Sequence, residues 1–192
     1  MIGLSVLAGA TFCLPHSGQV LALLVMLTAG VSGTSKFVAQ HSLVFSSYDV
    51  AMGRENAEHY ASRQLDHYAA ARYVRESLPS DARLLFIGET RPYYFRREAV
   101  APSAYDRHPL QRWVEESPSA EALVGRLAAE GITHVVLNVH EFKRVHDNYG
   151  VLAFSGEGAQ TNDRRLKDLP RVLTRLFSAN GVHVFEVPSP IR

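Results

Sequence analysis

The distribution of charged side chains constrains this chain more than any other feature of its sequence. No Asp, Glu, Lys or Arg occurs between Met1 and Ser35, and the first charged residue is Lys36, after which charges are frequent. The mean hydropathy of -0.06 conceals this division, because it averages an apolar part with a polar one. The chain therefore joins two physically different parts.

The apolar part has the properties of a membrane segment. The stretch Gly18–Gly33 is nearly long enough to span a bilayer, and Pro15–Gly18 separates it from an earlier apolar run. Either one long span or the end of one span followed by a second fits this pattern. A signal peptide would need a basic residue before the apolar run, and a buried core helix would show a polar face. We therefore expect a membrane segment over residues 1–35. Lys36 alone does not fix its orientation.

Length and charge limit the function of the polar part. We expect a connector close to the membrane surface over residues 36–54 and one domain over residues 55–192, and membrane lipid is the first expected partner. The net charge of +1, from 20 Lys+Arg and 19 Asp+Glu, argues against nucleic acid as a partner. Cys13 is the single cysteine, which excludes an intramolecular disulfide and a cysteine-based zinc site.

The domain alternates predicted helices with short apolar strands, which is typical of an α/β fold. The expected class is a small Rossmann-like layered domain, with about three main strands and flanking helices, preceded by an N-terminal membrane helix. Helices are predicted over 55–78, 106–117, 117–131, 141–150 and 169–181, and strands over 84–87, 132–139 and 182–187. Residues 93–95 and 99–101 are expected to be short extended pieces, and 152–165 a mobile loop.

Polar and aromatic residues gather where the first predicted strand ends. Glu89, Arg91 and Tyr94 follow the apolar run Leu84–Ile87, and ligands of open α/β sheets bind at the carboxyl ends of strands. These three residues are the candidate binding residues, for an anionic or sugar ligand. The competing interpretation, which we favour, is a turn that reaches the surface with local ion pairs of little energetic value.

No pattern in the domain predicts catalysis. His134, His140 and His146 lack the helical spacing of a zinc site, so no metal ligand is assigned. The Gly-x-Gly at Gly156–Gly158 follows no clear strand, which argues against a dinucleotide cradle. No Walker motif or nucleophile elbow occurs. We therefore predict no catalytic residue and no cofactor.

Four motifs together resemble a known family. They are Leu-Pro-Ser-Asp-Ala-Arg at Leu78–Arg83, Gly-Glu-Thr-Arg-Pro-Tyr-Tyr at Gly88–Tyr94, the Asp-x-x-Pro-Leu element at Asp106–Leu110, and Gly-Ile-Thr-His through Asn at Gly131–Asn138. This pattern resembles the C-terminal extracytoplasmic region of bacterial multi-pass GT-C membrane glycosyltransferases, related to protein mannosyltransferases and aminoarabinose transferases. The resemblance covers about residues 53 to 145 and the terminal strand.

The resemblance implies an accessory domain in the cytoplasmic membrane, facing the periplasmic side. The whole enzyme would transfer sugar from a polyprenyl-phosphate carrier, using acidic residues on loops between early membrane helices. This chain lacks that part, so we expect either the tail of a longer enzyme or a short product that keeps only the accessory domain. The family assigns no role to Glu89, Arg91 or Tyr94. Two other functions stay open: a membrane-anchored module that binds a partner or a glycan, and a small soluble Rossmann-like enzyme that binds nucleotide. The oligomeric state is not predicted.

Overall fold

The computed structural model describes residues 15–42 and 47–188, and the chain divides into two compact units, Met1–Tyr60 and Ala61–Arg192. In the first unit, α2 (His16–Gln40) is a helix long and apolar enough to cross a membrane, with a mean hydropathy of 1.6 over its most apolar window and none of that window buried. A short helix, α3 (Ser47–Ala51), follows it. The helix covers the stretch predicted to span a membrane, while the earlier apolar run at residues 1–14 lies outside the described residues.

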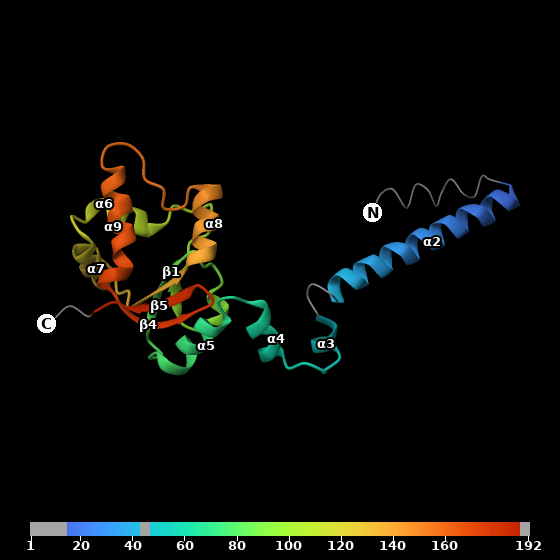
Figure 1. Cartoon of the computed structure of the whole chain (residues 1–192), viewed down its shortest axis with the longest axis horizontal. Coiled ribbons are helices and arrows are strands. Elements are labelled where there is room, and N and C mark those ends of the chain that lie inside the picture. Colours follow the sequence, from blue (N-terminus) through green and yellow to red (C-terminus); the bar gives the residue numbers. More distant parts are fainter. Residues whose placement is uncertain (1–14, 43–46, 189–192) are drawn as a thin grey trace. The chain divides into compact units, whose positions relative to one another are not determined.

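The second unit is built on one mixed sheet (Figure 1), and its strand order is β2-β1-β3-β5-β4. Its strands are β1 (Arg83–Ile87), β2 (Glu98–Val100), β3 (His134–Asn138), β4 (Thr174–Ala179) and β5 (Val182–Glu186). The pairs β2-β1 and β1-β3 are parallel, and the pairs β3-β5 and β5-β4 are antiparallel. The α/β class is confirmed, with five strands where the sequence indicated three main ones.

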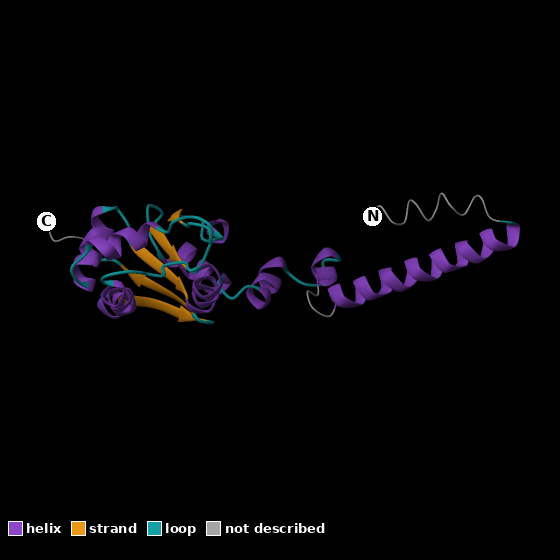
Figure 2. Ribbon diagram, turned by 90° about the horizontal axis from the view of Figure 1, so that it is seen from above, coloured by secondary structure: helices purple, strands orange, loops and turns teal. Residues whose placement is uncertain are grey.

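Helices cover both faces of this sheet (Figure 2). Leu85 and Ile87 pack against a core that includes side chains of α6 (Pro109–Glu116), α7 (Ala120–Ala129) and α9 (Ala159–Val172). Leu84 and Phe86 face the other way, into a core with α5 (Tyr68–Ser77). Both faces of β1 are buried, and this explains why its sequence does not alternate between apolar and polar residues.

The prediction of one continuous helix over 55–78 is wrong at residues 65–67. Two helices, α4 (Ala57–Gln64) and α5, replace it, with a break at residues 65–67. At the break, Oδ1 of Asp66 accepts a hydrogen bond from the backbone N–H of His67 at 2.8 Å. An aspartate that binds a nearby backbone N–H competes with helical hydrogen bonding, which explains why apolar periodicity alone missed this break.

The C-terminal third also differs from expectation. The segment predicted as a helix over 169–181 contains the last turn of α9, then β4 and the tight turn Asn180-Gly181 that leads into β5. Asn180 and Gly181 have φ values of 50° and 75°, as a two-residue hairpin turn requires. Asn-Gly here joins strands instead of ending a helix. The predicted mobile loop over 152–165 is wrong from Ala159 onward, where α9 begins.

The segment after β1 is not the expected extended piece. Residues Pro92–Tyr94 form a 3₁₀ helix, η2, and β2 then pairs parallel to β1, so the two strands form no hairpin. The guanidinium of Arg97 holds this connection by donating to the carbonyl oxygens of Leu78 and Pro79, at 2.8 and 2.7 Å. Leu78 is the C-cap of α5, so one arginine ties the end of that helix to the start of β2.

Gly88, directly after β1, permits a close approach of two backbones. Its φ is +71°, and a Cβ at this position would lie 2.4 Å from the backbone N of Phe142 and 2.5 Å from the carbonyl O of Asn138. The left-handed φ and the lack of space both require glycine. Gly88 thus brings the end of β1 against the start of α8 (Val139–Tyr149).

We expect Gly88→Ala to lower the free energy of unfolding by about 3 kcal/mol or more, since it combines left-handed strain with a backbone clash. Trp113 is the only tryptophan and is buried in this unit, so its fluorescence during denaturant unfolding measures the effect. Gly125→Ala in α7, where a Cβ meets nothing within 4 Å, is the control and should be neutral or slightly stabilising. Equal effects of the two substitutions would contradict the role given to Gly88.

Candidate functional site

The candidate site lies at the carboxyl ends of β1 and β3, two adjacent parallel strands. After β1 the chain passes to Phe95 in the core on the α5 side, whereas after β3 it enters α8, whose Phe142 packs against the opposite core. The segments that follow β1 and β3 therefore pass to opposite faces of the sheet. This divergence is the place where open α/β sheets commonly bind ligands.

A buried carboxylate is the centre of the site. The side chain of Glu89 is fully buried, and the guanidinium of Arg91 binds both of its oxygens, with Nε to Oε1 at 2.7 Å and Nη2 to Oε2 at 2.9 Å. Oε1 also accepts the backbone N–H groups of Thr90 at 2.9 Å and Arg91 at 3.0 Å. A paired guanidinium and backbone donors are what allow a carboxylate to remain ionised when it is buried.

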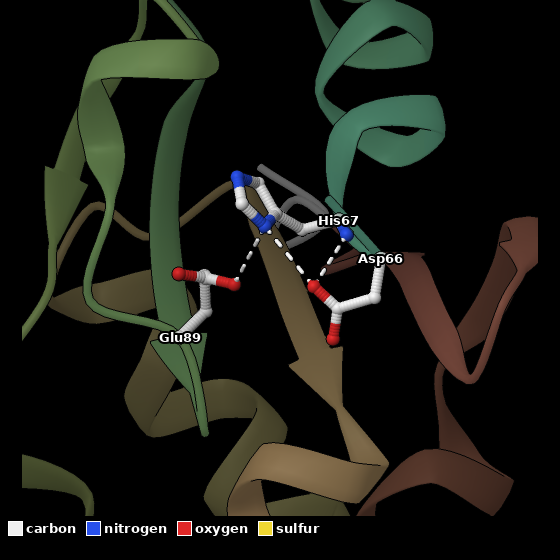
Figure 3. Close-up of side chains that lie close together, drawn as sticks. All are labelled: Asp66, His67 and Glu89. Carbon is white, nitrogen blue, oxygen red and sulfur yellow. Dashed lines mark hydrogen bonds and ion pairs between the residues drawn. The ribbon is translucent and has the colours of Figure 1, made fainter. Parts of the chain in front are cut away.

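A histidine lies between two carboxylates in this site (Figure 3). His67 is fully buried, and its Nδ1 is 3.2 Å from Oδ1 of Asp66 and 3.5 Å from Oε2 of Glu89. Its Nε2 points away from both carboxylates in Figure 3 and has no hydrogen-bond partner among the described residues. Because only Nδ1 faces acceptors, we assign a neutral ring that carries its proton on Nδ1.

Asn138 connects the site to the end of β3. Its Nδ2 donates to Oδ2 of Asp66 at 2.9 Å and to Oε2 of Glu89 at 3.4 Å. Its Oδ1 accepts the backbone N–H of Glu141 at 3.2 Å, which makes Asn138 the N-cap of α8. One buried amide therefore caps a helix and supplies donors to two carboxylates.

The surroundings shift the pKa values of the acidic groups downward. Burial alone would raise the pKa of Glu89, but the hydrogen bonds from Arg91 outweigh it, together with the charge of Arg91 and the charge that His67 carries once it is protonated at low pH. Burial would likewise raise the pKa of Asp66, and hydrogen bonds from Asn138 and His67 reverse the effect. For His67, burial lowers the pKa and the attraction of Glu89 offsets it only in part. The site therefore holds two carboxylates and a neutral histidine at neutral pH.

Asp66, His67 and Glu89 each offer one ligand atom within 4.8 Å of the others, so they form a possible set of metal ligands that the sequence did not indicate. The guanidinium of Arg91 already holds both oxygens of Glu89. A metal ion would have to displace this cation or share the carboxylate with it. The donor set as it stands is therefore arranged for an internal ion pair.

The three residues predicted as a binding group have different surroundings. Glu89 and Arg91 form the ion pair that the turn interpretation expected, but Glu89 is buried in the domain and not at its surface. Tyr94 is half-buried, with its ring 5.1 Å from the ring of His67 in an edge-to-face contact, while Tyr93 is 82% exposed. Tyr94 thus packs inside the site, and Tyr93 is the tyrosine that faces solvent.

Sequence reasoning missed Asp66 and His67 because it placed them inside a continuous helix. Their acid-histidine order carries no diagnostic spacing, and only the break before α5 turns them toward β1. Asn138 was recognised as part of a motif without a role. A signal did exist for Asn138, because an Asn at the end of a β-branched run and three residues before a Glu is typical of a helix start.

Comparisons with known proteins add little to this geometry. No protein-family model matches the chain, and no curated protein matches it. Among solved structures, it is similar to the C-terminal globular domain of an oligosaccharyltransferase from Archaeoglobus fulgidus, with a TM-score of 0.43 and 14% sequence identity, over 65% of this chain and 97% of that one. A likeness this distant transfers no residue role to the present chain.

We expect Arg91→Ala to lower the free energy of unfolding by about 2 kcal/mol. This loss is more than the limit of about 1 kcal/mol for a surface ion pair, and less than that for a fully buried pair because Arg91 is partly exposed. The reason is that Glu89 would remain buried without its cation. Trp113 fluorescence in denaturant measures the loss. The double variant Glu89→Gln/Arg91→Ala should lose less than the sum of the single variants, because neither uncompensated charge remains. Strict additivity would show that the pair is not coupled.

We also expect the stability of the domain to fall in two stages on acidification. Burial lowers the pKa of His67 from 6.5 in the folded chain. Below about pH 6.5 the unfolded chain therefore binds a proton more readily than the folded chain, and the free energy of unfolding falls. Buried His108 acts in the same direction. The carboxylates of Asp66 and Glu89, with lowered pKa values, contribute stability above about pH 4.5 that is lost as pH falls through their folded pKa values.

Thermal unfolding followed by Trp113 fluorescence between pH 7.5 and 3 tests this expectation. Glu89→Gln should flatten the stage below about pH 4.5, because it removes one carboxylate. It should deepen the stage near pH 6, because the charge of Glu89 no longer offsets the lowering of the His67 pKa by burial. A midpoint temperature that does not change between pH 7.5 and 5 would contradict the assignment of a neutral buried His67.

Proposed function

We propose that this chain is anchored in the cytoplasmic membrane by α2, and that its α/β unit is the extracytoplasmic accessory domain of a glycosyltransferase-like protein. The activity of the whole protein would be sugar transfer from a polyprenyl-phosphate carrier, with the catalytic groups supplied by a membrane part that this chain lacks. In this proposal residues 36–54 connect the anchor to the domain, and the domain helps to shape the site of the acceptor.

The observation that carries the non-catalytic role is that groups of the chain itself bind both carboxylates of the polar site. Each carboxylate oxygen of Asp66 and Glu89 binds a group of the chain itself, and Nδ1 of His67 lies between the two carboxylates. A general base or nucleophile needs a free lone pair that faces a substrate. Nε2 of His67 has no partner among the described residues, but the side chain of His67 is fully buried, so this nitrogen faces no solvent. These residues instead hold two strands and two helices together, which suits a structural accessory domain.

The motifs that carry the family resemblance have structural roles of the same kind. Arg83 donates from Nη1 to the carbonyl of Glu130 at 2.7 Å, at the end of α7, and its backbone N–H donates to Oγ1 of Thr133 at 2.9 Å. His108 connects α6 to β1, with Nε2 2.9 Å from the carbonyl O of Phe86 and Nδ1 accepting from the N–H of Leu110. A shared pattern of this type favours a shared fold of the accessory region.

A glycan-binding module is the second candidate function, and exposed aromatic rings favour it. Tyr93 is 82% exposed and Tyr105 is 85% exposed, and the ring of Tyr105 contacts that of Tyr149 at 5.7 Å. Flat exposed rings are suitable surfaces for sugar faces. Loss of glycan binding in Tyr93→Ala and Tyr105→Ala variants, measured on a glycan array, would favour this candidate, whereas the absence of binding by the unaltered chain would exclude it for the glycans tested.

The full chain expressed in a bacterium should remain in the membrane pellet after extraction at alkaline pH, because α2 carries no Asp or Glu and only one Lys. The single Cys13 permits a test of sidedness. In a Cys13→Ser background, Ser155→Cys in the exposed loop before α9 should react with an impermeant maleimide before the cytoplasmic membrane is broken. Recovery of the chain in the aqueous fraction would overturn the anchor, and labelling only after lysis would overturn the sidedness.

The accessory role is tested by a transfer assay on the same membranes. With a polyprenyl-phosphate-linked sugar and a set of acceptors, membranes that contain this chain alone should transfer no more label than membranes without it. Transfer above that background, lost on Glu89→Gln, would contradict the accessory role and make the buried carboxylate a catalytic group.

A further inference from the structure

A second candidate site lies between α8 and α9, and no residue of the polar cluster lines it. It is a cavity of about 330 Å³ whose floor is formed by sheet residues, among them Ile87, Leu137 and Phe185, and whose walls include Phe142 from α8 and Leu166 from α9. Both helices rise from the same side of the sheet in Figure 1. Its volume and its predominantly apolar lining are those of a small-molecule site.

The cavity leaves apolar surface incompletely covered at the centre of the sheet. Leu137 belongs to β3, which is flanked on both sides by β1 and β5. Its neighbours Ile87 and Phe185 are 4% exposed, yet Leu137 itself is only half-buried. A leucine in a central strand is normally covered by a helix, so the separation of α8 from α9 exposes surface that a ligand could cover.

Two unpaired cations border the apolar lining. Lys143 on α8 and Lys167 on α9 line the cavity and are exposed, and neither has a hydrogen bond or ion pair within residues 15–42 and 47–188. They are the only lysines in the sequence after Lys36. Asp163 also lines the cavity, so its carboxylate reduces the positive charge there.

His146 completes the polar lining of the cavity, and it is already engaged. Its Nδ1 is 2.9 Å from the carbonyl O of Val151. With one carboxylate against two ammonium groups, the rim attracts an anion, and it does so beside a predominantly apolar interior.

We propose that this cavity binds a single-chain amphiphile with an anionic head group. Its hydrocarbon chain covers Leu137 and lies between Phe142 and Leu166, and its carboxylate or phosphate is held by Lys143 and Lys167. Lysines are suited to this task because their ammonium groups move on flexible stems toward a point charge. The proposal concerns the domain alone and holds whether or not the chain belongs to a glycosyltransferase.

Photo-crosslinking of the full chain in nanodiscs of zwitterionic lipid tests this site. The probe is a twelve-carbon fatty acid with a diazirine near its methyl end, and its adducts are mapped by mass spectrometry after proteolysis. Adducts are expected on cavity residues such as Phe142 and Leu166. Excess dodecanoate or dodecyl phosphate should suppress them, and dodecyltrimethylammonium should not. Whichever of the two anions competes better identifies the head group.

Charge reversal separates the cavity from general attraction to a basic surface. Lys143→Glu/Lys167→Glu should reduce the adduct yield in the cavity by about threefold to tenfold, because two attractive contacts become repulsive. Arg144→Glu/Arg164→Glu is the matched control. It changes the net charge by the same amount and on the same two helices, but at residues that do not line the cavity. All four side chains are exposed, so circular dichroism should confirm unchanged folding.

Three results would overturn the proposal. Adducts confined to α2 or scattered over the surface would show that the cavity takes up no chain. Equal loss of adducts in the two double variants would show that net charge, and not the two lysines, governs capture. Competition by dodecyltrimethylammonium as strong as by dodecanoate would show that the head group is not recognised.

Discussion

The interaction on which the rest of the domain depends is the burial of one ionised carboxylate between two parallel strands. A carboxylate without water must be paired and hydrogen-bonded, or it destabilises the fold by several kcal/mol. Glu89 meets this condition through the guanidinium of Arg91, two backbone N–H groups and the amide of Asn138. These partners come from the turn after β1 and from the end of β3, so the same contacts that neutralise the charge fix the two strand ends relative to each other.

This arrangement also explains the break between α4 and α5. A continuous helix would leave Asp66 on its polar face, whereas the break places Asp66 within reach of Asn138 and His67 beside Glu89. Gly88 brings α8 close to the same cluster, because only a residue without Cβ lets β1 end against the backbone of Phe142. The polar cluster therefore joins the break before α5, the turn after β1, and the end of β3 where α8 begins, and its carboxylate oxygens serve that junction.

Much of the fold follows from local pattern, and the site does not. Apolar runs predicted β1, β3 and β5, and the sequence around Gly131 correctly ended α7, because burial on both faces and a left-handed glycine leave direct marks in the sequence. The hairpin at Asn180-Gly181 was missed, although Asn-Gly is a strong hairpin signal, because apolar spacing before it also fits a helix. Residues 65–67 depend on a partner more than 70 positions away, Asn138, and no window of local sequence contains that information.

The polar cluster and the cavity between α8 and α9 differ in which of their groups remain available to bind another molecule. The switch between β1 and β3 is a place where α/β proteins often bind ligands, but here other groups of the chain bind both carboxylates. Nε2 of His67 has no partner among the described residues, and it is buried. Between α8 and α9 the reverse holds: the position is not a usual binding site of the fold, while Leu137 lacks cover and Lys143 and Lys167 lack partners among the described residues. Binding requires surface and charge that the protein itself has not satisfied. On that criterion the apolar cavity, and not the polar cluster beside the strand ends, is where this domain retains the capacity to hold another molecule.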